Sequence, residues 1–124
     1  HKGLDIAGPI GTPIYATADG VVGRAQWVSG YGKYVEVEHG NAIQTRYGHL
    51  SAMNVYSGQR IRKGDIIGFM GSTGRSTGSH LHYEVRIAGE PVNPTSFLEP
   101  ATKVSNILIA SKDTDSKSVG GPAE

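Results

Sequence analysis

Residues 80–87 alternate between polar and apolar side chains, a period of two that fits a β-strand and not a helix. One face would carry Leu81, Tyr83, Val85 and Ile87, and the other His80, His82, Glu84 and Arg86. The first face has the composition of a core, whereas packing gives no reason for two histidines on the second. On a strand, His80 and His82 would lie about 6.6 Å apart on one surface. Two neutral imidazoles held in this way make half of a transition-metal site.

The rest of the chain also favours short strands over helices. An apolar period of 3.6 residues nowhere persists for three turns, and the 124 residues include 18 glycines and 6 prolines. We therefore predict an all-β fold, mainly antiparallel, with little helix. Short strands are expected within residues 13–16, 20–23, 33–38, 42–49 and 66–70. Alternation in residues 42–49 places Tyr47 and His49 on one face, where Tyr47 could contact a substrate or pack in the core.

Composition excludes several classes of function. The chain has the length of one domain with a hydrophobic core. Lys and Arg number 12 against 11 Asp and Glu, and a formal net charge of +1 gives no case for nucleic-acid binding. No apolar run reaches the about 18 residues that span a membrane, so no transmembrane segment is expected. Cysteine is absent, so a metal would have to be held by His, Asp or Glu.

Two further motifs could complete a metal site. His1 and Asp5 are separated by three residues that include a glycine, a spacing that suits two ligands on an extended or bent backbone. His49 ends the strand predicted within residues 42–49. Each motif alone is weak evidence, but together with the His80–His82 pair they indicate a metal centre. Spacing alone leaves open whether His80 and His82 bind the ion together.

The order of these motifs resembles that of the LytM/lysostaphin-type zinc endopeptidases of bacterial cell walls. The resemblance covers about residues 1–100 and is carried by His-x-x-x-Asp at 1–5, Tyr-x-His-Leu at 47–50 and His-Leu-His-Tyr-Glu at 80–84. The glycine-rich segment 71–78 and Val-Asn-Pro at 92–94 also agree. The resemblance implies a β-sheet fold with an active-site groove, and we expect the 71–79 loop to be a flexible wall of that groove. Trp27 and Tyr31 could line it or simply pack.

The resemblance also implies a set of site residues, with His1, Asp5 and His82 as Zn²⁺ ligands and His49 and His80 as the catalytic pair. Three protein ligands leave a fourth position for water, as in catalytic zinc sites. Zinc activates that water for attack on a peptide bond, and imidazoles can transfer the protons near neutral pH. Which histidine is the base stays open. Glu84 shares their strand face and is a candidate for orienting one of them.

The implied function is zinc-dependent hydrolysis of the peptide cross-links of peptidoglycan by an endopeptidase. Segments 45–47 and 71–78 look most like the Gram-negative branch of the family, whose members cleave the D-alanyl–diaminopimelate bond. We therefore expect an exported protein of the periplasm or cell envelope. The alternative is a non-catalytic LytM-type regulator that binds the cell wall or activates an amidase. Such regulators have lost zinc ligands, whereas this chain keeps all five site residues.

The chain is expected to divide into a catalytic part and a tail. Residues 1–100 are predicted to be the zinc endopeptidase domain, with further sequence upstream of His1 in the natural protein. Residues 101–124 are a C-terminal extension that we predict to be largely a disordered tail, because it is mostly polar. We expect a monomer whose partner is peptidoglycan, with an inhibitory N-terminal region or a regulatory protein as a further partner.

Overall fold

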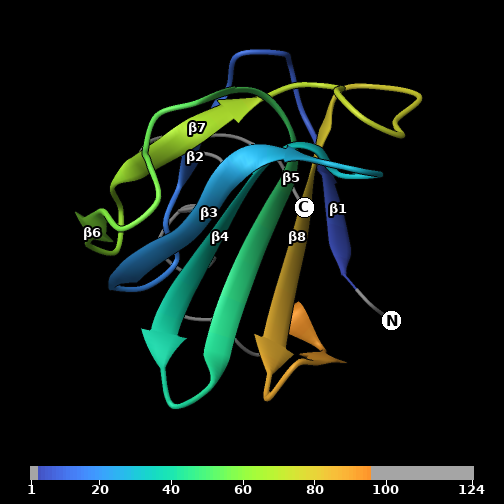
Figure 1. Cartoon of the computed structure of the whole chain (residues 1–124). Coiled ribbons are helices and arrows are strands. Elements are labelled where there is room, and N and C mark those ends of the chain that lie inside the picture. The colour runs from blue at the N-terminus through green and yellow to red at the C-terminus, as the bar shows by residue number, and fades with distance from the viewer. Residues whose placement is uncertain (1–2, 96–124) are drawn as a thin grey trace.

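The computed structural model describes residues 3–95, which form nine β-strands (Figure 1). The strands are β1 (Leu4–Ala7), β2 (Pro13–Tyr15), β3 (Gly20–Val28), β4 (Gly32–Gly40), β5 (Ile43–Met53), β6 (Arg60–Ile61), β7 (Ile66–Met70), β8 (His80–Ile87) and β9 (Glu90–Val92). The main path of the sheet runs β1-β8-β5-β4-β3-β6, β2 pairs with β7, β7 also pairs with β5, and β9 pairs with β8. Every strand pair is antiparallel. Helical conformation among the described residues is confined to Pro94 and Thr95, so the predicted all-β fold is confirmed.

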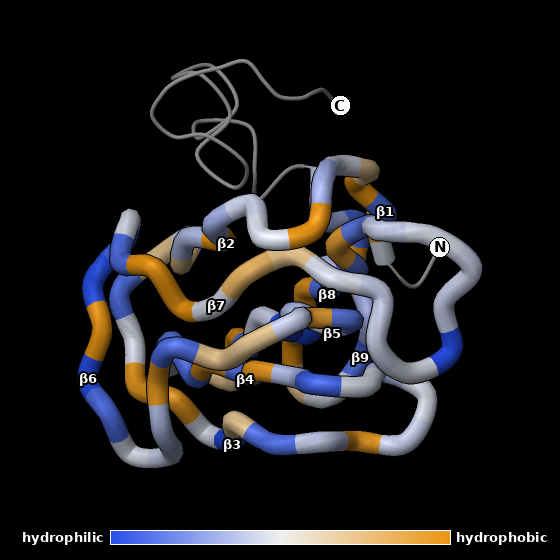
Figure 2. The backbone as a smooth tube through the Cα atoms, turned by 90° about the horizontal axis from the view of Figure 1, so that it is seen from above, coloured by the Kyte–Doolittle hydropathy of each residue, from blue (hydrophilic) through white to orange (hydrophobic). Residues whose placement is uncertain are grey.

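The hydrophobic core lies between the β2–β7 pair and the part of the sheet formed by β4, β5 and β8 (Figure 2). Alternation directs every second side chain of these strands inward, as predicted for Leu81, Tyr83 and Val85. Ile87, which was predicted on the same core face, is instead 44% exposed at the end of β8. The fully buried side chains include Ile14, Ile67, Val35, Leu81 and Tyr83. Burying a side chain of this size stabilises the fold by about 1.5–3 kcal/mol. The opposite face of β5 and β8 is left to polar side chains, and the candidate site lies there.

The prediction that Tyr47 and His49 lie on the same face of the strand is wrong. Tyr47 is fully buried in the core, so the alternative of a substrate contact is excluded. His49 has a φ of 63°, and the pairing of β4 with β5 slips at this point, from Val35↔Tyr47 to Lys33↔Leu50. The extra residue on β5 is a β-bulge, which interrupts the alternation. Because of the bulge, His49 lies on the polar face and not with Tyr47.

Residues 1–2 and 96–124 lie outside the described residues. The predicted ligand His1 and the predicted tail 101–124 therefore stay predictions. Residues 3–95 contain no helix with the length and apolarity needed to cross a membrane.

Candidate metal centre

Strand pairing brings Asp5 and His82 together from distant parts of the chain. β1 runs antiparallel to β8 at the edge of the sheet, with Asp5 directly opposite His82 and Ala7 opposite His80. Directly opposed residues share a face, and Asp5 Oδ1 lies 2.8 Å from His82 Nδ1 and 3.6 Å from His80 Nε2. A Cβ on Gly3 would lie 2.7 Å from the His82 ring, so a glycine is needed for β1 to approach it. Two of the predicted metal ligands therefore converge.

His49 and His80 form a second pair beside these ligands, with ring centroids 4.7 Å apart. His49 Nδ1 lies 2.7 Å from the carbonyl oxygen of Thr73, and His80 Nδ1 lies 2.8 Å from that of Gly78. Because a carbonyl only accepts, each Nδ1 is assigned the proton and each Nε2 keeps a lone pair. Burial lowers the pKa of His49, although the bond to Thr73 opposes this effect. Both rings can therefore accept a proton at Nε2.

The 71–79 loop passes beside His49 and is anchored by hydrogen bonds. The Thr73 hydroxyl donates to the carbonyl of Leu50 at 2.6 Å. The Arg75 N–H donates to the carbonyl of Gly30, in the turn between β3 and β4, at 3.0 Å. These bonds fix the Thr73 carbonyl that holds the His49 ring. The expected flexible wall is thus tied down where it touches the histidine.

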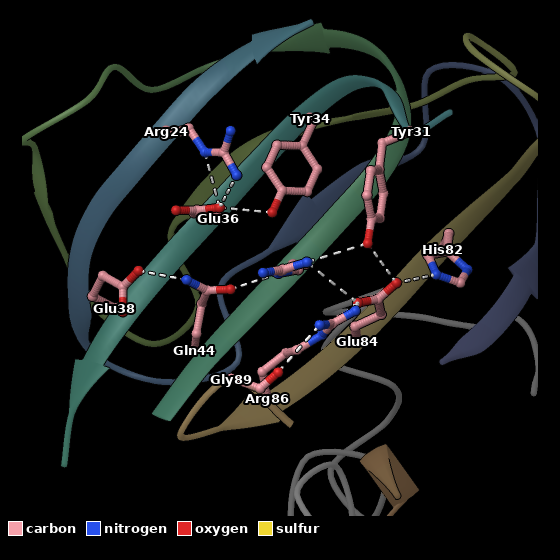
Figure 3. Close-up of polar contacts among 11 residues, drawn as sticks. Arg24, Tyr31, Tyr34, Glu36, Glu38, Gln44, His82, Glu84, Arg86 and Gly89 are labelled. Carbon is pink, nitrogen blue, oxygen red and sulfur yellow. Dashed lines mark hydrogen bonds and ion pairs between the residues drawn. The ribbon is translucent and has the colours of Figure 1, made fainter. Parts of the chain in front are cut away.

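Glu84 is a buried carboxylate next to the metal-facing residues (Figure 3). Its Oε2 accepts hydrogen bonds from His82 Nε2 at 2.7 Å and from the Tyr31 hydroxyl at 2.9 Å. Burial acts to raise the pKa of Glu84, but the bonds from His82 and Tyr31 and the charge of Arg86 outweigh it and lower the pKa to about 2. The bond to Glu84 in turn raises the pKa of His82, against the effect of burial. Of the two strand histidines, His82 is the one that Glu84 contacts.

Tyr31 and Thr73 join the site through contacts that their sequence positions do not reveal. Tyr31 lies in the turn between β3 and β4 and reaches Glu84 across the sheet. The only sequence signal for Thr73 is its place in the glycine-rich segment 71–78. Trp27 remains 58% exposed. Side chains that meet only after the strands pair are not linked by any spacing in the sequence.

The ligand atoms in the described part of the site suit a zinc ion, but they do not make a complete set of zinc ligands. Within residues 3–95, no group of three or more His, Asp or Glu side chains is placed to hold a metal ion. Asp5 and His82 present one carboxylate oxygen and one imidazole nitrogen to the same space, and both atom types are zinc ligands. The third predicted ligand, His1, lies outside the described residues.

Most of the sequence matches the model of a known family. The model of peptidase family M23 matches residues 1–94, a span that contains all five predicted site residues. The chain belongs to peptidase family M23. This M23 chain is 50% identical over 105 residues to the DD-carboxypeptidase/endopeptidase Mpg of Neisseria meningitidis, covering 85% of the chain and 24% of the relative. It is 42% identical over 121 residues to the peptidoglycan DD-endopeptidase ShyA of Vibrio cholerae, covering 93% and 28%. The chain thus spans about a quarter of the length of these curated relatives.

Solved M23-type structures share the fold. A zinc-containing peptidase from Vibrio cholerae superposes with a TM-score of 0.72 and 43% identity, covering 74% of this chain and 28% of that one. The catalytic domain of lysostaphin from Staphylococcus simulans gives a TM-score of 0.75 and 35% identity, covering 80% and 79%. The predicted resemblance to LytM/lysostaphin-type peptidases is therefore confirmed.

Proposed function

We propose that this M23 chain is a zinc-dependent endopeptidase that hydrolyses the peptide cross-links of bacterial peptidoglycan. The observation that carries the proposal is the convergence of Asp5 and His82 with the His49–His80 pair at one end of β8. One pair offers ligand atoms to a metal, and the other offers two proton-exchanging nitrogens. Metal-assisted hydrolysis of a peptide bond needs both functions within one site.

Zinc would be held by His1, Asp5 and His82, with one position left open. When bound, the ion would acidify a water molecule and polarise the scissile carbonyl. The carboxylate oxygen of Asp5 and the imidazole nitrogen of His82 are both typical zinc ligands, which supports zinc as the metal. The similarity to the zinc-containing peptidase from Vibrio cholerae supports it as well. Because Glu84 occupies His82 Nε2, the nitrogen that faces Asp5 is Nδ1.

His49 and His80 would divide the proton transfers of the reaction. Burial favours the neutral form of His49, which has its lone pair at Nε2. His80 carries the same tautomer, and its Nε2 faces the Asp5 carboxylate at 3.6 Å. One ring would take the proton of the attacking water. The other would protonate the leaving amine or stabilise the developing oxyanion.

The proposed substrate bond is the D-alanyl–diaminopimelate cross-link, and the proposed place of action is the periplasm or cell envelope. The names of two curated relatives, a DD-carboxypeptidase/endopeptidase and a peptidoglycan DD-endopeptidase, support a DD bond in peptidoglycan. Within the chain, the proposed catalytic unit is residues 1–100, and residues 101–124 are an extension. We further propose that the protein acts as a monomer, restrained by an inhibitory N-terminal region or a regulatory protein.

The test is digestion of purified diaminopimelate-type sacculi by the zinc-loaded chain, with the released muropeptides identified by mass spectrometry. Loss of cross-linked dimers and gain of monomers, abolished both by chelation and by His80→Ala, would support the proposal. An unchanged muropeptide profile despite one bound zinc per chain would contradict it and favour the non-catalytic LytM-type regulator. Stimulation of a cell-wall amidase by the same preparation would then test that alternative directly.

A further inference from the structure

A network of polar and ionic contacts extends from the metal-facing histidine across three strands of the sheet (Figure 3). Its centre is Glu84 on β8, of which only 3% is exposed. Strand register sets Arg46 of β5 directly opposite Glu84, and Gln44 opposite Arg86. Further along, Arg46 Nε donates to Gln44, and Gln44 donates to Glu38 of β4 at 2.6 Å. The network therefore links β8 to β5 and β4 through paired positions of the sheet.

The two oxygens of Glu84 have separate partners. Oε2 faces the site and binds His82 and Tyr31 at 2.7 and 2.9 Å. Oε1 faces away and binds Arg86 at 3.1 Å through both Nε and Nη2, with Arg46 Nη1 at 3.9 Å. With one oxygen held by guanidinium groups, the carboxylate cannot turn away from His82 without losing a charged, buried contact. The arginine contacts to Oε1 therefore fix the orientation of Oε2 toward His82.

The contact to Oε2 decides which nitrogen of His82 can bind a metal. Both ring nitrogens lie within hydrogen-bond distance of a carboxylate oxygen, Nε2 of Glu84 and Nδ1 of Asp5. A metal held between Asp5 and His82 would replace the proton at Nδ1, so Nε2 would remain the nitrogen that donates to Glu84. Nδ1 is the nitrogen that lies 2.8 Å from Asp5 Oδ1. A ring rotated the other way would turn its ligand nitrogen away from Asp5. The rotated ring would also lose the contacts of its two nitrogens with Asp5 and Glu84.

We propose that Glu84 is a positioning residue that holds His82 with Nε2 protonated and Nδ1 directed at the zinc position. The inference rests on the zinc site of the proposed function. Glu84 touches neither zinc nor substrate and acts through His82 alone. Tyr31 supports it by filling the second hydrogen-bonding position of Oε2.

The test measures the zinc dissociation constant of the full chain by competition with a chelator of known affinity. Loss of such a carboxylate partner weakens metal binding by about 10–100-fold, which is the result expected for Glu84→Ala. Glu84→Gln keeps an acceptor for the His82 proton and should recover part of that loss. Tyr31→Phe should weaken zinc binding by a smaller factor than Glu84→Ala, because the His82 contact remains.

Glu36→Ala is the matched control. Glu36 lies on the same side of the sheet, is 8% exposed, and binds Arg24 and the Tyr34 hydroxyl instead of His82. Its loss removes a buried ionic contact of the same kind and should leave zinc affinity at the wild-type value. Equal losses of affinity in Glu36→Ala and Glu84→Ala would mean that Glu84 is only structural, and would overturn the proposal.

A second readout follows the ring itself. Long-range ¹H–¹⁵N correlations of the zinc-loaded chain should show His82 protonated at Nε2, and Glu84→Ala should lose this single state. Wild-type zinc affinity and an unchanged His82 ring in both Glu84 variants would overturn the proposal. If Glu84→Ala does not fold, Glu84→Gln and Tyr31→Phe decide by the same two readouts. A wild-type chain that binds no zinc would instead remove the proposed metal site, and this inference with it.

Discussion

The two faces of β5 and β8 both bury polar side chains, but they pair them with different kinds of partner. The polar side chains that β5 and β8 bury on the core face carry neutral hydroxyls. There the Tyr83 hydroxyl meets Thr17 Oγ1 at 2.9 Å, and the Tyr47 hydroxyl meets Thr45 Oγ1 at 2.9 Å. The opposite face uses charged groups, with the Glu84 carboxylate between a histidine and two arginines.

This difference in partners distinguishes residues that stabilise the fold from residues that orient the metal site. Neutral hydroxyls can be buried at little cost once each has a partner, and here the partners are other hydroxyls and the His39 ring. A buried carboxylate carries a large desolvation cost, and an apolar pair could replace it without loss of stability. The charged face is therefore explained by what it directs toward the site, and the hydroxyl face by packing. Substitutions on the two faces should affect different quantities.

The largest effect on activity is expected at His49, which the bulge in β5 places on the face opposite to that of Tyr47. His49→Ala should lower the rate of cross-link hydrolysis by about 10²–10⁴-fold, the usual contribution of a general acid or base. Zinc content and thermal unfolding should stay close to wild type. The measurement is the initial rate of muropeptide release at equal zinc loading. A residual rate near that of wild type would show that His49 takes no part in the proton transfers.

A smaller effect is expected from the loop that holds His49. Gly74 has a φ of 75°, and a Cβ there would collide with the backbone of Gly32. Gly74→Ala should displace the Thr73 carbonyl and lower activity by roughly 10–100-fold, because small misplacements of reacting groups are costly. Thr77→Ala is the control, because Thr77 is an exposed residue of the same loop that contacts neither histidine of the pair. Equal rates for the two variants, measured on the same sacculi, would refute the anchoring role of the loop.

On the core face, Tyr47→Phe should change stability and not activity. The substitution removes the hydroxyl that contacts Thr45 and both the N–H and Oγ1 of Thr17. Leaving these groups short of a partner should lower the free energy of unfolding by about 1–3 kcal/mol. Tyr56→Phe, at a site 69% exposed, should stay within about 0.5 kcal/mol of wild type. Denaturant unfolding checks both values, and a large loss of activity in folded Tyr47→Phe would break the separation of the two faces.

The smallest expected effect is a shift in titration. Burial lowers the pKa of His49, so its midpoint should lie below the ordinary value of about 6.5. The unfolded chain then binds more protons than the folded chain in this interval. The His49 contribution to stability is therefore complete above about pH 6.5 and is lost as the pH falls toward the folded pKa. An NMR titration of the His49 ring gives the midpoint, and a value above 6.5 would mean that a nearby negative charge outweighs burial.

Sequence patterns predicted those parts of the molecule that depend on neighbours along the chain. Alternation in residues 80–87 identified β8, its buried face and its histidine face, and the lack of helical periodicity identified the fold class. Motif order identified the family. The pairing of Asp5 with His82 followed only from the resemblance, because no local signal links a register between β1 and β8.

Alternation failed to predict the face of His49, where a β-bulge interrupts β5. The bulge at His49 adds one residue to β5, and nothing in Tyr47-Gly48-His49 marks the change of face apart from the glycine. Tyr31 was predicted only to line the groove or to pack, and the roles of Tyr31 and Thr73 in the site could not be predicted for another reason. Each acts through a hydrogen bond that forms only after the β3–β4 turn and the 71–79 loop have come together.

The most direct test of the proposed site is an experimental structure of the zinc-loaded chain. We predict one zinc ion held by Asp5, His82 Nδ1 and His1, with His82 Nε2 bonded to Glu84 and both His49 and His80 free of the metal. A zinc ion bound by His80 and His82 together, or by His82 through Nε2, would contradict this prediction. The first arrangement would end the proposed division of the site into metal ligands and a proton-transferring pair, and the second would end the proposed positioning role of Glu84.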